Sequence, residues 1–191
     1  MAALGNVLTQ GASGDTATTA SIYSIYHCLA RYVHTTNAGA YVGVSGTSAP
    51  VTVNGVTSTK ATLIKPVLPK FGSGTRKYFI TTVAGHAADS ATLVDPTNDN
   101  TSCIVDTYAG QGINEHDGTA IKGIGAGAVG PFSIPQWVSQ AKAASTRVTD
   151  RRNGVILLGA TANSVAAAPT TGTGATVATN TAFPIKRIMY N

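Results

Sequence analysis

The stretch from Ala20 to His34 reads ASIYSIYHCLARYVH, and its apolar side chains recur three or four residues apart. This spacing is typical of one face of an α-helix. The apolar positions are Ile22, Ile25, Tyr26, Leu29 and Val33. We therefore expect a short helix over 20–34, with Ser21 or Thr19 as its N-cap. Because Tyr, Ile and Val also favour sheets, a strand is the alternative.

Residues 1–19, which precede this stretch, have a different composition. Glycines and small polar residues dominate them, and Asp15 is their single charged side chain. This composition predicts an N-terminal arm. Residues 20–191 are then expected to form one β-rich domain, since the length suits a single domain.

Beyond the expected helix, two short strands are predicted at Ala40–Val44 and Val51–Val56, joined by a turn rich in Gly, Ser and Pro. The run that follows contains Pro66 and Pro69, which remove backbone donors and favour extended geometry. We therefore interpret 60–75 as an extended segment, either an edge strand or an arm.

Further strands are expected where β-branched and aromatic residues gather. These segments are Lys77–Ala84, 91–94, 103–108, Val155–Leu158 and 183–190. The uncharged Ala/Thr/Gly-rich segment 160–182 has no helical pattern and is expected to be a loop or an extended ribbon.

A second helix is expected over 133–150, where Ser133 and Gln136 have the spacing of a capping box. Asn153-Gly154 then supplies a left-handed stop. Taken together, these patterns predict a mainly β fold, a small β-sandwich or barrel with short helices at about 20–34 and 133–150. Extended segments at 60–75 and 160–182 complete this prediction.

Charge is unusually scarce in this chain. Only 11% of the residues are Asp, Glu, Lys or Arg, and Glu115 is the single glutamate. Ordinary globular domains carry roughly 25% charged residues. Because interspersed charge normally keeps a free monomer soluble, so neutral a surface indicates a subunit that is covered by neighbours.

The charges that remain form two blocks. The span 60–77 contains five cations and no acid, whereas 89–117 contains six of the eight acidic residues and no Lys or Arg. In a monomer these blocks can pair, and in an assembly they can set the register between subunits. The candidate assembly contacts are Lys60, Lys65, Lys70, Arg76, Lys77, Asp95, Asp99 and Asp106.

The two cysteines, Cys28 and Cys103, lie far apart in sequence and form no CxxC motif. Because no export signal is recognisable at the N-terminus, we expect two buried thiols rather than a disulfide. No apolar run approaches the ~20 residues that a membrane span needs, so no membrane partner is expected.

Two motifs invite a chemical interpretation and are better explained without one. Gly125–Gly130 matches G-x-G-x-x-G, but Pro131 delays the following helix, so a flexible glycine loop is expected rather than a nucleotide site. The positions of a calcium loop are filled by Asp95, Thr97, Asp99, Thr101 and Asp106. Because Asn100 replaces the central glycine, a solvated turn is expected there.

The histidines do not assemble into a recognisable site. His27 and His34 are seven residues apart, too far to share a metal on one helix, and Glu115-His116-Asp117 are sequence neighbours whose side chains point in different directions. No catalytic signature is present. We expect no enzymatic activity and no cofactor.

The chain is rich in Thr, Ala, Gly and Val, poor in charge, and has glycine-rich arms. In this overall composition it resembles structural proteins of bacteriophage virions. The resemblance implies a capsid cement or decoration subunit that stabilises the head shell through extended-arm contacts. It also implies partners such as copies of itself and a major capsid protein, with synthesis in the host cytoplasm and residence in the virion.

Two other functions remain open from the sequence. A tail-tube or connector subunit could use the acidic block 89–117 to repel passing DNA. A carbohydrate- or receptor-binding module would need an exposed aromatic beside polar side chains, and Tyr108 near Asp106 is the candidate. The net charge of +5 permits nucleic-acid contact, but the scattered basic residues do not indicate a specific one.

Overall fold

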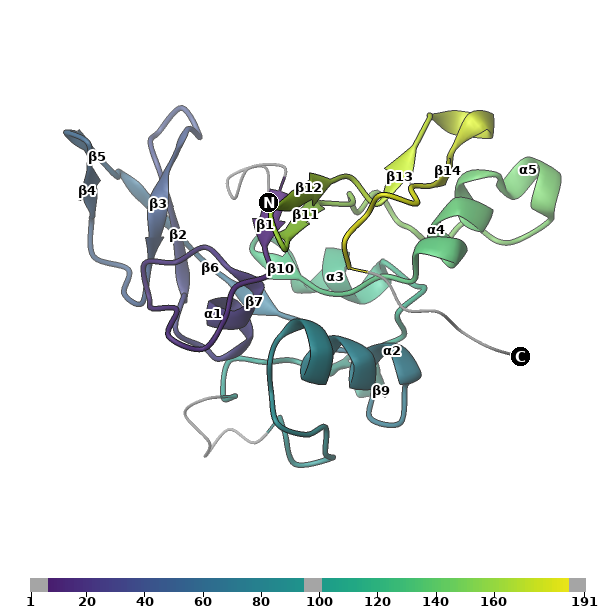
Figure 1. Cartoon of the computed structure of the whole chain (residues 1–191), viewed down its shortest axis with the longest axis horizontal. Coiled ribbons are helices and arrows are strands. Elements are labelled where there is room, and N and C mark those ends of the chain that lie inside the picture. Colours follow the sequence, from purple (N-terminus) through teal and green to yellow (C-terminus); the bar gives the residue numbers. More distant parts are fainter. Residues whose placement is uncertain (1–6, 95–100, 186–191) are drawn as a thin grey trace.

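A computed structural model describes residues 7–94 and 101–185 of the chain (Figure 1). The first helix, α1, spans Ile22–Tyr26. Ser21 is its N-cap, because the Ser21 side chain accepts a hydrogen bond from the backbone N–H of Ser24 and the Ser24 side chain returns the contact. This capping box confirms Ser21 over Thr19 as the start of the helix.

The helix is much shorter than the expected 20–34. Cys28 adopts a left-handed backbone with φ 57°, which an α-helix cannot continue through. The chain then turns and re-enters as strand β2, Tyr32–Thr35. The first half of the stretch is therefore helical and the second half is a strand, so each of the two interpretations holds for part of it.

Strand β2 is the centre of a three-stranded antiparallel sheet (Figure 1). Its neighbours are β3, Tyr41–Ser45, and β6, Lys60–Leu63. A hairpin between them, β4 (Thr52–Val53) and β5 (Val56–Thr57), turns at Asn54-Gly55, where both residues have positive φ. The strand expected at Ala40–Val44 corresponds to β3. The single strand expected at Val51–Val56 is wrong, because the turn at Asn54-Gly55 divides this segment into β4 and β5.

The proline-containing segment is part of the domain and not an arm. Strand β6 lies at the edge of its sheet, as one of the two interpretations of 60–75 required. The chain continues into β7, Lys65–Pro66, which pairs in parallel with β10, Ala128–Val129. Val67 and Leu68 follow with at most 1% of their surface exposed, so this segment runs through the interior.

The strand expected at Lys77–Ala84 is wrong. Helix α2, Gly74–Tyr78, begins after the N-cap Ser73 and runs directly into a π-helix, η2, Phe79–Val83. The buried side chains are Arg76, Ile80, Val83 and Ala84. These positions have the i, i+4, i+7, i+8 spacing of a helix face, a pattern that the β-branched composition concealed.

The acidic region contains little regular structure. Residues 91–94 form turns and bends instead of the expected strand. Within 103–108, Val105 bridges Val67, and only Thr107–Tyr108 forms a strand, β8, which pairs with β9, Gln111–Gly112. Helix α3, Thr119–Ile124, follows.

The helix expected over 133–150 is broken and shorter. Helix α4, Ile134–Ala141, is followed at Lys142 by a second short helix, α5, Ala143–Thr146. Ser133 is the N-cap of α4, but its side chain makes no capping hydrogen bond, so the expected capping box does not form. Arg147 ends α5 with a left-handed backbone.

Short strands make up the C-terminal segment. The strand expected at Val155–Leu158 lies further along the chain, as β11, Gly159–Ala162. The strands that follow pair as two hairpins, so 160–182 is an extended ribbon with regular pairing. Its other elements are β12 (Val165–Ala167), β13 (Thr170–Thr171), the 3-10 helix η3 (Gly174–Thr176) and β14 (Ala178–Thr179). Most of the strand predicted at 183–190 falls outside the described residues.

The N-terminal segment belongs to the domain as well. Strand β1, Val7–Thr9, pairs in parallel with β11, and Leu8 is buried in the core. The first described residues of the predicted arm, Val7–Thr9, are therefore part of a sheet of the domain.

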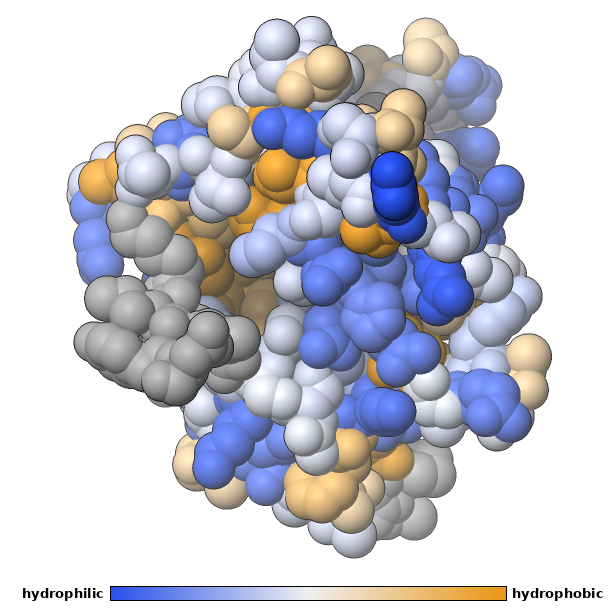
Figure 2. All heavy atoms as spheres, turned by 90° about the vertical axis from the view of Figure 1, so that its right-hand side faces the viewer, coloured by the Kyte–Doolittle hydropathy of each residue, from blue (hydrophilic) through white to orange (hydrophobic). Residues whose placement is uncertain are grey.

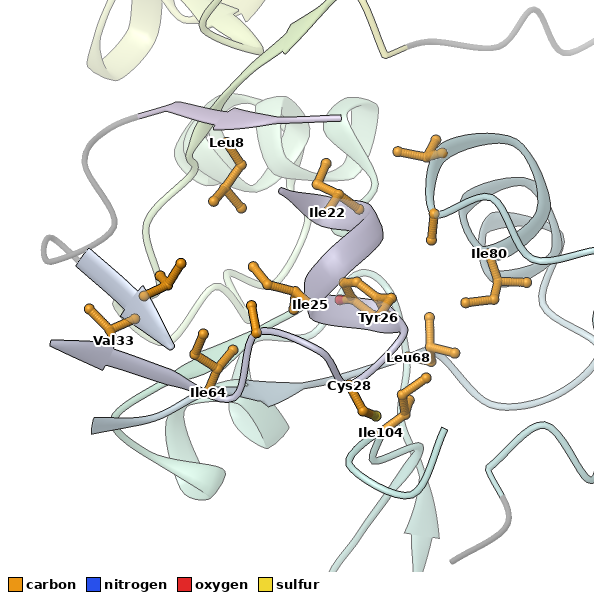
Figure 3. Packing of buried hydrophobic residues seen from close by; sticks show 14 residues of the cluster. Leu8, Ile22, Ile25, Tyr26, Cys28, Val33, Ile64, Leu68, Ile80 and Ile104 are labelled. Atoms are coloured by element: carbon orange, nitrogen blue, oxygen red, sulfur yellow. The ribbon is translucent and has the colours of Figure 1, made fainter. Parts of the chain in front are cut away.

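The main core surrounds α1 (Figure 3). Ile25 and Tyr26 are both 1% exposed, and side chains from β1, β2, η2 and the segments around Ile64, Leu68 and Ile104 converge on them. In α1, Ile22, Ile25 and Tyr26 are all buried in this core, so the helix is held by packing although it is only five residues long. A second, smaller cluster joins Val67 to α3 and β10.

The expectation of two free thiols is wrong. Cys28, at the end of α1, forms a disulfide with Cys103, across 75 residues of sequence. The left-handed turn at Cys28 and the turn around Thr101 bring the two side chains together beside Ile104. The sequence spacing could not reveal this proximity, because it depends on how the intervening chain folds.

The fold is thus mixed, with about 24% strand and 21% helix. Its strands are short and belong to several small sheets, none of which closes into a barrel among the described residues. The β-rich expectation holds only in this coarse form.

Candidate functional site

An open groove of about 1500 Å³ lies between α1, α2 and η2 on one side and α3, α4 and the 153–160 segment on the other. Figure 2 shows hydrophobic side chains on the floor of a recess on this face of the molecule. The groove exceeds the roughly 300–1,000 Å³ of typical small-molecule sites. Its size therefore suits a segment of polypeptide better than a small ligand.

Aromatic side chains form one wall. Phe132 and Trp137 pack edge to face, with ring centroids 5.1 Å apart. The guanidinium of Arg152 lies 5.3 Å from the centre of the Trp137 ring. Arg152 is itself fixed by Asp150, whose carboxylate oxygen accepts a hydrogen bond at 2.7 Å. This hydrogen bond lowers the pKa of Asp150 to about 2.

The opposite wall is held rigidly. The Tyr26 ring packs edge to face on Phe79 at 4.8 Å, and its hydroxyl lies 3.0 Å from the carbonyl oxygens of Val67 and Val129. Burial raises the pKa of Tyr26, so this hydroxyl stays protonated as a donor. Because these partners come from three separate segments, Tyr26 fixes the groove wall to the core.

The segment Val155–Leu158 lines the groove without belonging to a strand. Ile156 is 60% exposed. Among the described residues, Val155 is the member of this segment whose backbone makes a hydrogen bond, donated to Arg152. In this apolar run, the Ile156 side chain is therefore exposed, and the backbones of Ile156, Leu157 and Leu158 make no hydrogen bond to another described residue.

The charged blocks partly pair within the chain. Arg76 is fully buried, and it donates to Asp89 at 2.8 Å and to Asp106 at 2.7 Å. It also donates to the carbonyls of Pro69 and Ser90. The cation of Arg76 is thus satisfied inside the fold, and the structure does not present it to a neighbouring molecule.

The other candidate contacts lie in different places. Lys60, Lys70 and Lys77 are exposed, on β6, after β7 and on α2 respectively. Lys65 is half-buried and donates from Nζ to the carbonyl of Ile124 at 2.9 Å. Asp95 and Asp99 lie outside the described residues. The structure therefore brings Arg76 and Asp106 together but not the lysines.

The glycine motif has a packing role. Helix α3 precedes it, and β10 begins within it, whereas a dinucleotide site needs a strand before and a helix after. A Cβ on Gly127 would lie 1.9 Å from the carbonyl oxygen of Leu63. The expected flexible loop is thus a tightly packed crossing of β10 against the β6–β7 segment.

The calcium-loop positions within 95–106 and the Glu115-His116-Asp117 sequence do not form a site either. Thr101 is buried, and the Asp106 carboxylate is already paired with Arg76, so neither is free to hold a cation. Glu115 and His116 line the groove, whereas Asp117 lies in a different, smaller pocket. In the described part of the chain, no three His, Cys, Asp or Glu side chains converge on a possible metal position.

An unexpected stack of rings lies at the end of α1. The His27 ring stacks between Tyr23, at 3.8 Å, and His86, at 3.9 Å. Nε2 of His86 lies 2.9 Å from the carbonyl oxygen of Tyr26. Burial lowers the pKa of His86, the hydrogen bond to Tyr26 opposes this, and His27 adds to the lowering. The stack ties the end of η2 to α1.

Comparisons with protein-family models, curated proteins and solved structures found no match for this chain. Of the helices that the structure describes, none is long and apolar enough to cross a membrane.

Sequence reasoning did not identify the groove, because its walls come from many separate segments. The apolar run Val155–Leu158 and the neighbouring Phe132 and Trp137 were the available signals. These signals also fit buried core elements, because sequence alone cannot distinguish an apolar segment that is buried within the chain from one that is exposed until another chain binds it.

Proposed function

We propose that this chain is a structural subunit of a virion, a cement or decoration protein of the head shell. The observation that carries the proposal is the open apolar groove, whose exposed Ile156 and aromatic wall face solvent in the single chain. Exposed apolar recesses of this kind often mark sites where another molecule binds. In the assembly, a second copy of the chain covers it.

The chemistry of the groove suits such an occupant. An extended segment of a neighbour can bury apolar side chains against Ile156 and Trp137 while pairing its backbone with Val155–Leu158. A low density of charge reduces the repulsion between copies packed closely in a lattice. Many weak contacts of this kind sum to a stable shell.

The disulfide adds independent support. Disulfides persist in oxidising surroundings, which include the surfaces of virions, and are rare where thiols are kept reduced. A cement subunit acts on the released particle, where the Cys28–Cys103 bridge can persist. The fold also favours the head shell over the tail tube, because Arg76 neutralises two of the acids that would have to repel DNA in a lumen.

Replacing Ile156 by Asp tests the groove contact directly. Sedimentation equilibrium over a range of concentrations should show self-association of the unmodified chain. I156D should weaken it about tenfold or more, because burying an aliphatic side chain contributes about 1.5–3 kcal/mol. Ile156 is 60% exposed, so the substitution should leave the fold intact.

Val53→Asp is the matched control. Val53 is an exposed apolar residue of β4, is 43% exposed, and does not line the groove. Its substitution should leave association unchanged. A strictly monomeric parent chain, or equal association of I156D and the parent, would contradict the proposal.

A further inference from the structure

A second, smaller hollow lies between the β8–β9 hairpin and the start of α3. Its volume is about 140 Å³, and it shares no lining residue with the groove. The side chains around it are Tyr108, Gln111, Ile113, Asn114, Asp117 and Thr119. It thus combines one aromatic ring with two carboxamides and a carboxylate.

The aromatic ring is fixed in position. Ala109 and Gly110, at the tip of the hairpin, both have positive φ, as a tight two-residue turn requires. This turn holds Tyr108 against α3, where a Cβ on Gly123 would lie 2.0 Å from the Tyr108 hydroxyl oxygen. Gly123 therefore leaves the space that the Tyr108 side chain occupies. The ring is still 36% exposed, so part of it remains available to a ligand.

The polar side chains divide into one that is fixed and two that are open. The Asp117 carboxylate accepts a hydrogen bond from the Thr119 backbone N–H at 2.8 Å. Burial alone would raise the pKa of Asp117, but the hydrogen bonds from Thr119 outweigh it and lower the pKa. The carboxylate is therefore ionised at neutral pH. Gln111 is exposed and Asn114 is half-buried, and their side-chain amides hydrogen-bond to none of the described residues, so each offers a donor and an acceptor.

We propose that this hollow binds one neutral sugar ring, the end unit of a glycan. A pyranose has an apolar C–H face that packs on an aromatic ring, and hydroxyls that pair with amides and carboxylates. At about 140 Å³, the hollow is below the roughly 300–1,000 Å³ of drug-sized sites, which fits a single ring. The ionised Asp117 disfavours anionic ligands.

The site corrects the cluster that the sequence suggested. Tyr108 is an exposed aromatic, as expected, but Asp106 is occupied by Arg76. Asp117 supplies the carboxylate instead. A glycan contact goes beyond the assembly role, because it would let the outer face of a shell hold a surface polysaccharide.

Saturation-transfer NMR tests the proposal with glucose, galactose, mannose and N-acetylglucosamine, each in millimolar excess over the whole chain. A ligand of this size is expected to bind with a Kd on the order of 1 mM. At least one sugar should show saturation of its ring C–H protons. Tyr108→Ala should abolish the signal, and Gln111→Ala should reduce it about threefold or more.

Gln111→Ala keeps the test independent of folding, because Gln111 is exposed and alanine retains the backbone through which β9 pairs with β8. Tyr41→Ala, which removes an exposed tyrosine on β3, should leave the signal unchanged. The proposal is overturned if none of the four sugars is saturated, or if the signal survives both hollow variants. Binding of protonated glucosamine alone would also overturn it, since Asp117 would then be recognising charge. I156D, which tests the groove, should not affect sugar binding, so the two proposals fail separately.

Discussion

Arg76 shows at the scale of a single residue how this fold handles its few charges. Its guanidinium has no exposed surface, and the side chains of its partners Asp89 and Asp106 are 5% and 20% exposed. Removing one member of a buried ion pair leaves the other charge uncompensated, at a cost of about 3–5 kcal/mol. The sequence showed a basic block beside an acidic block, but it could not show which of the five cations would be buried in the fold.

Arg76→Met should therefore reduce the free energy of unfolding by about 3–5 kcal/mol in urea titrations. Arg152→Met is the matched control, because its pair with Asp150 lies at the surface, with side chains 26% and 43% exposed. That substitution should change stability by no more than about 1 kcal/mol. Equal losses in the two variants would contradict the buried network.

The lowered pKa of His86 predicts that the stability of the fold depends on pH. Its pKa is lower in the folded chain than the ordinary value of 6.5, so the unfolded chain binds more protons as the pH falls below 6.5. His86 therefore lowers stability with falling pH in that window. His86→Gln should flatten the fall in unfolding free energy below pH 6.5, as measured by urea titration at each pH.

His116→Gln provides the comparison, because His116 lies on the groove wall, outside the ring stack. It should leave the contribution of the ring stack to the pH response in place. If H86Q and the parent lose stability in parallel as the pH falls, His86 does not contribute to the pH response.

At the scale of elements, the sequence was informative where local signals decide the structure. Ser21 is the N-cap of α1, and the residues near Ala40–Val44 form β3. Prediction from the sequence was wrong where tertiary packing overrides the secondary-structure propensity of a segment. The Lys77–Ala84 segment has the composition of a strand, yet burial of Arg76 and Ile80 on one face holds it as a helix.

The Cys28–Cys103 disulfide is the link between elements that is hardest to predict from the sequence. Removing it tests whether the two cysteines are paired in the fold. It joins the end of α1 to the segment that carries Asp106, across 75 residues. The double variant Cys28→Ser/Cys103→Ser should lose about 2–5 kcal/mol of stability in urea titrations, through the larger entropy of the open unfolded chain.

A reducing agent should lower the stability of the parent chain to a similar extent and leave the double variant unchanged. Two titratable thiols per chain in the native protein, with no effect of reductant, would restore the interpretation of two free cysteines.

At the scale of the whole molecule, the scarcity of charge and the open groove both indicate a surface that another subunit covers. The sequence indicated a subunit covered by neighbours, and the groove gives that indication a location. What the sequence could not supply is the location itself, because Tyr26, Phe132 and Ile156 meet only after the chain has folded. Parts of two expected arms are held within the domain, because Val7–Thr9 pairs with β11 and Lys65–Pro66 pairs with β10.

Hydrogen–deuterium exchange at the backbone amides of Ile156, Leu157 and Leu158, followed through a dilution series, tests the covered groove most directly. None of these amides donates a hydrogen bond to another described residue. If a second copy pairs with them, exchange should be slow in concentrated protein and accelerate on dilution, as the neighbour leaves. Exchange at one rate across the whole series would contradict the account, because the groove would then have no partner of its own kind.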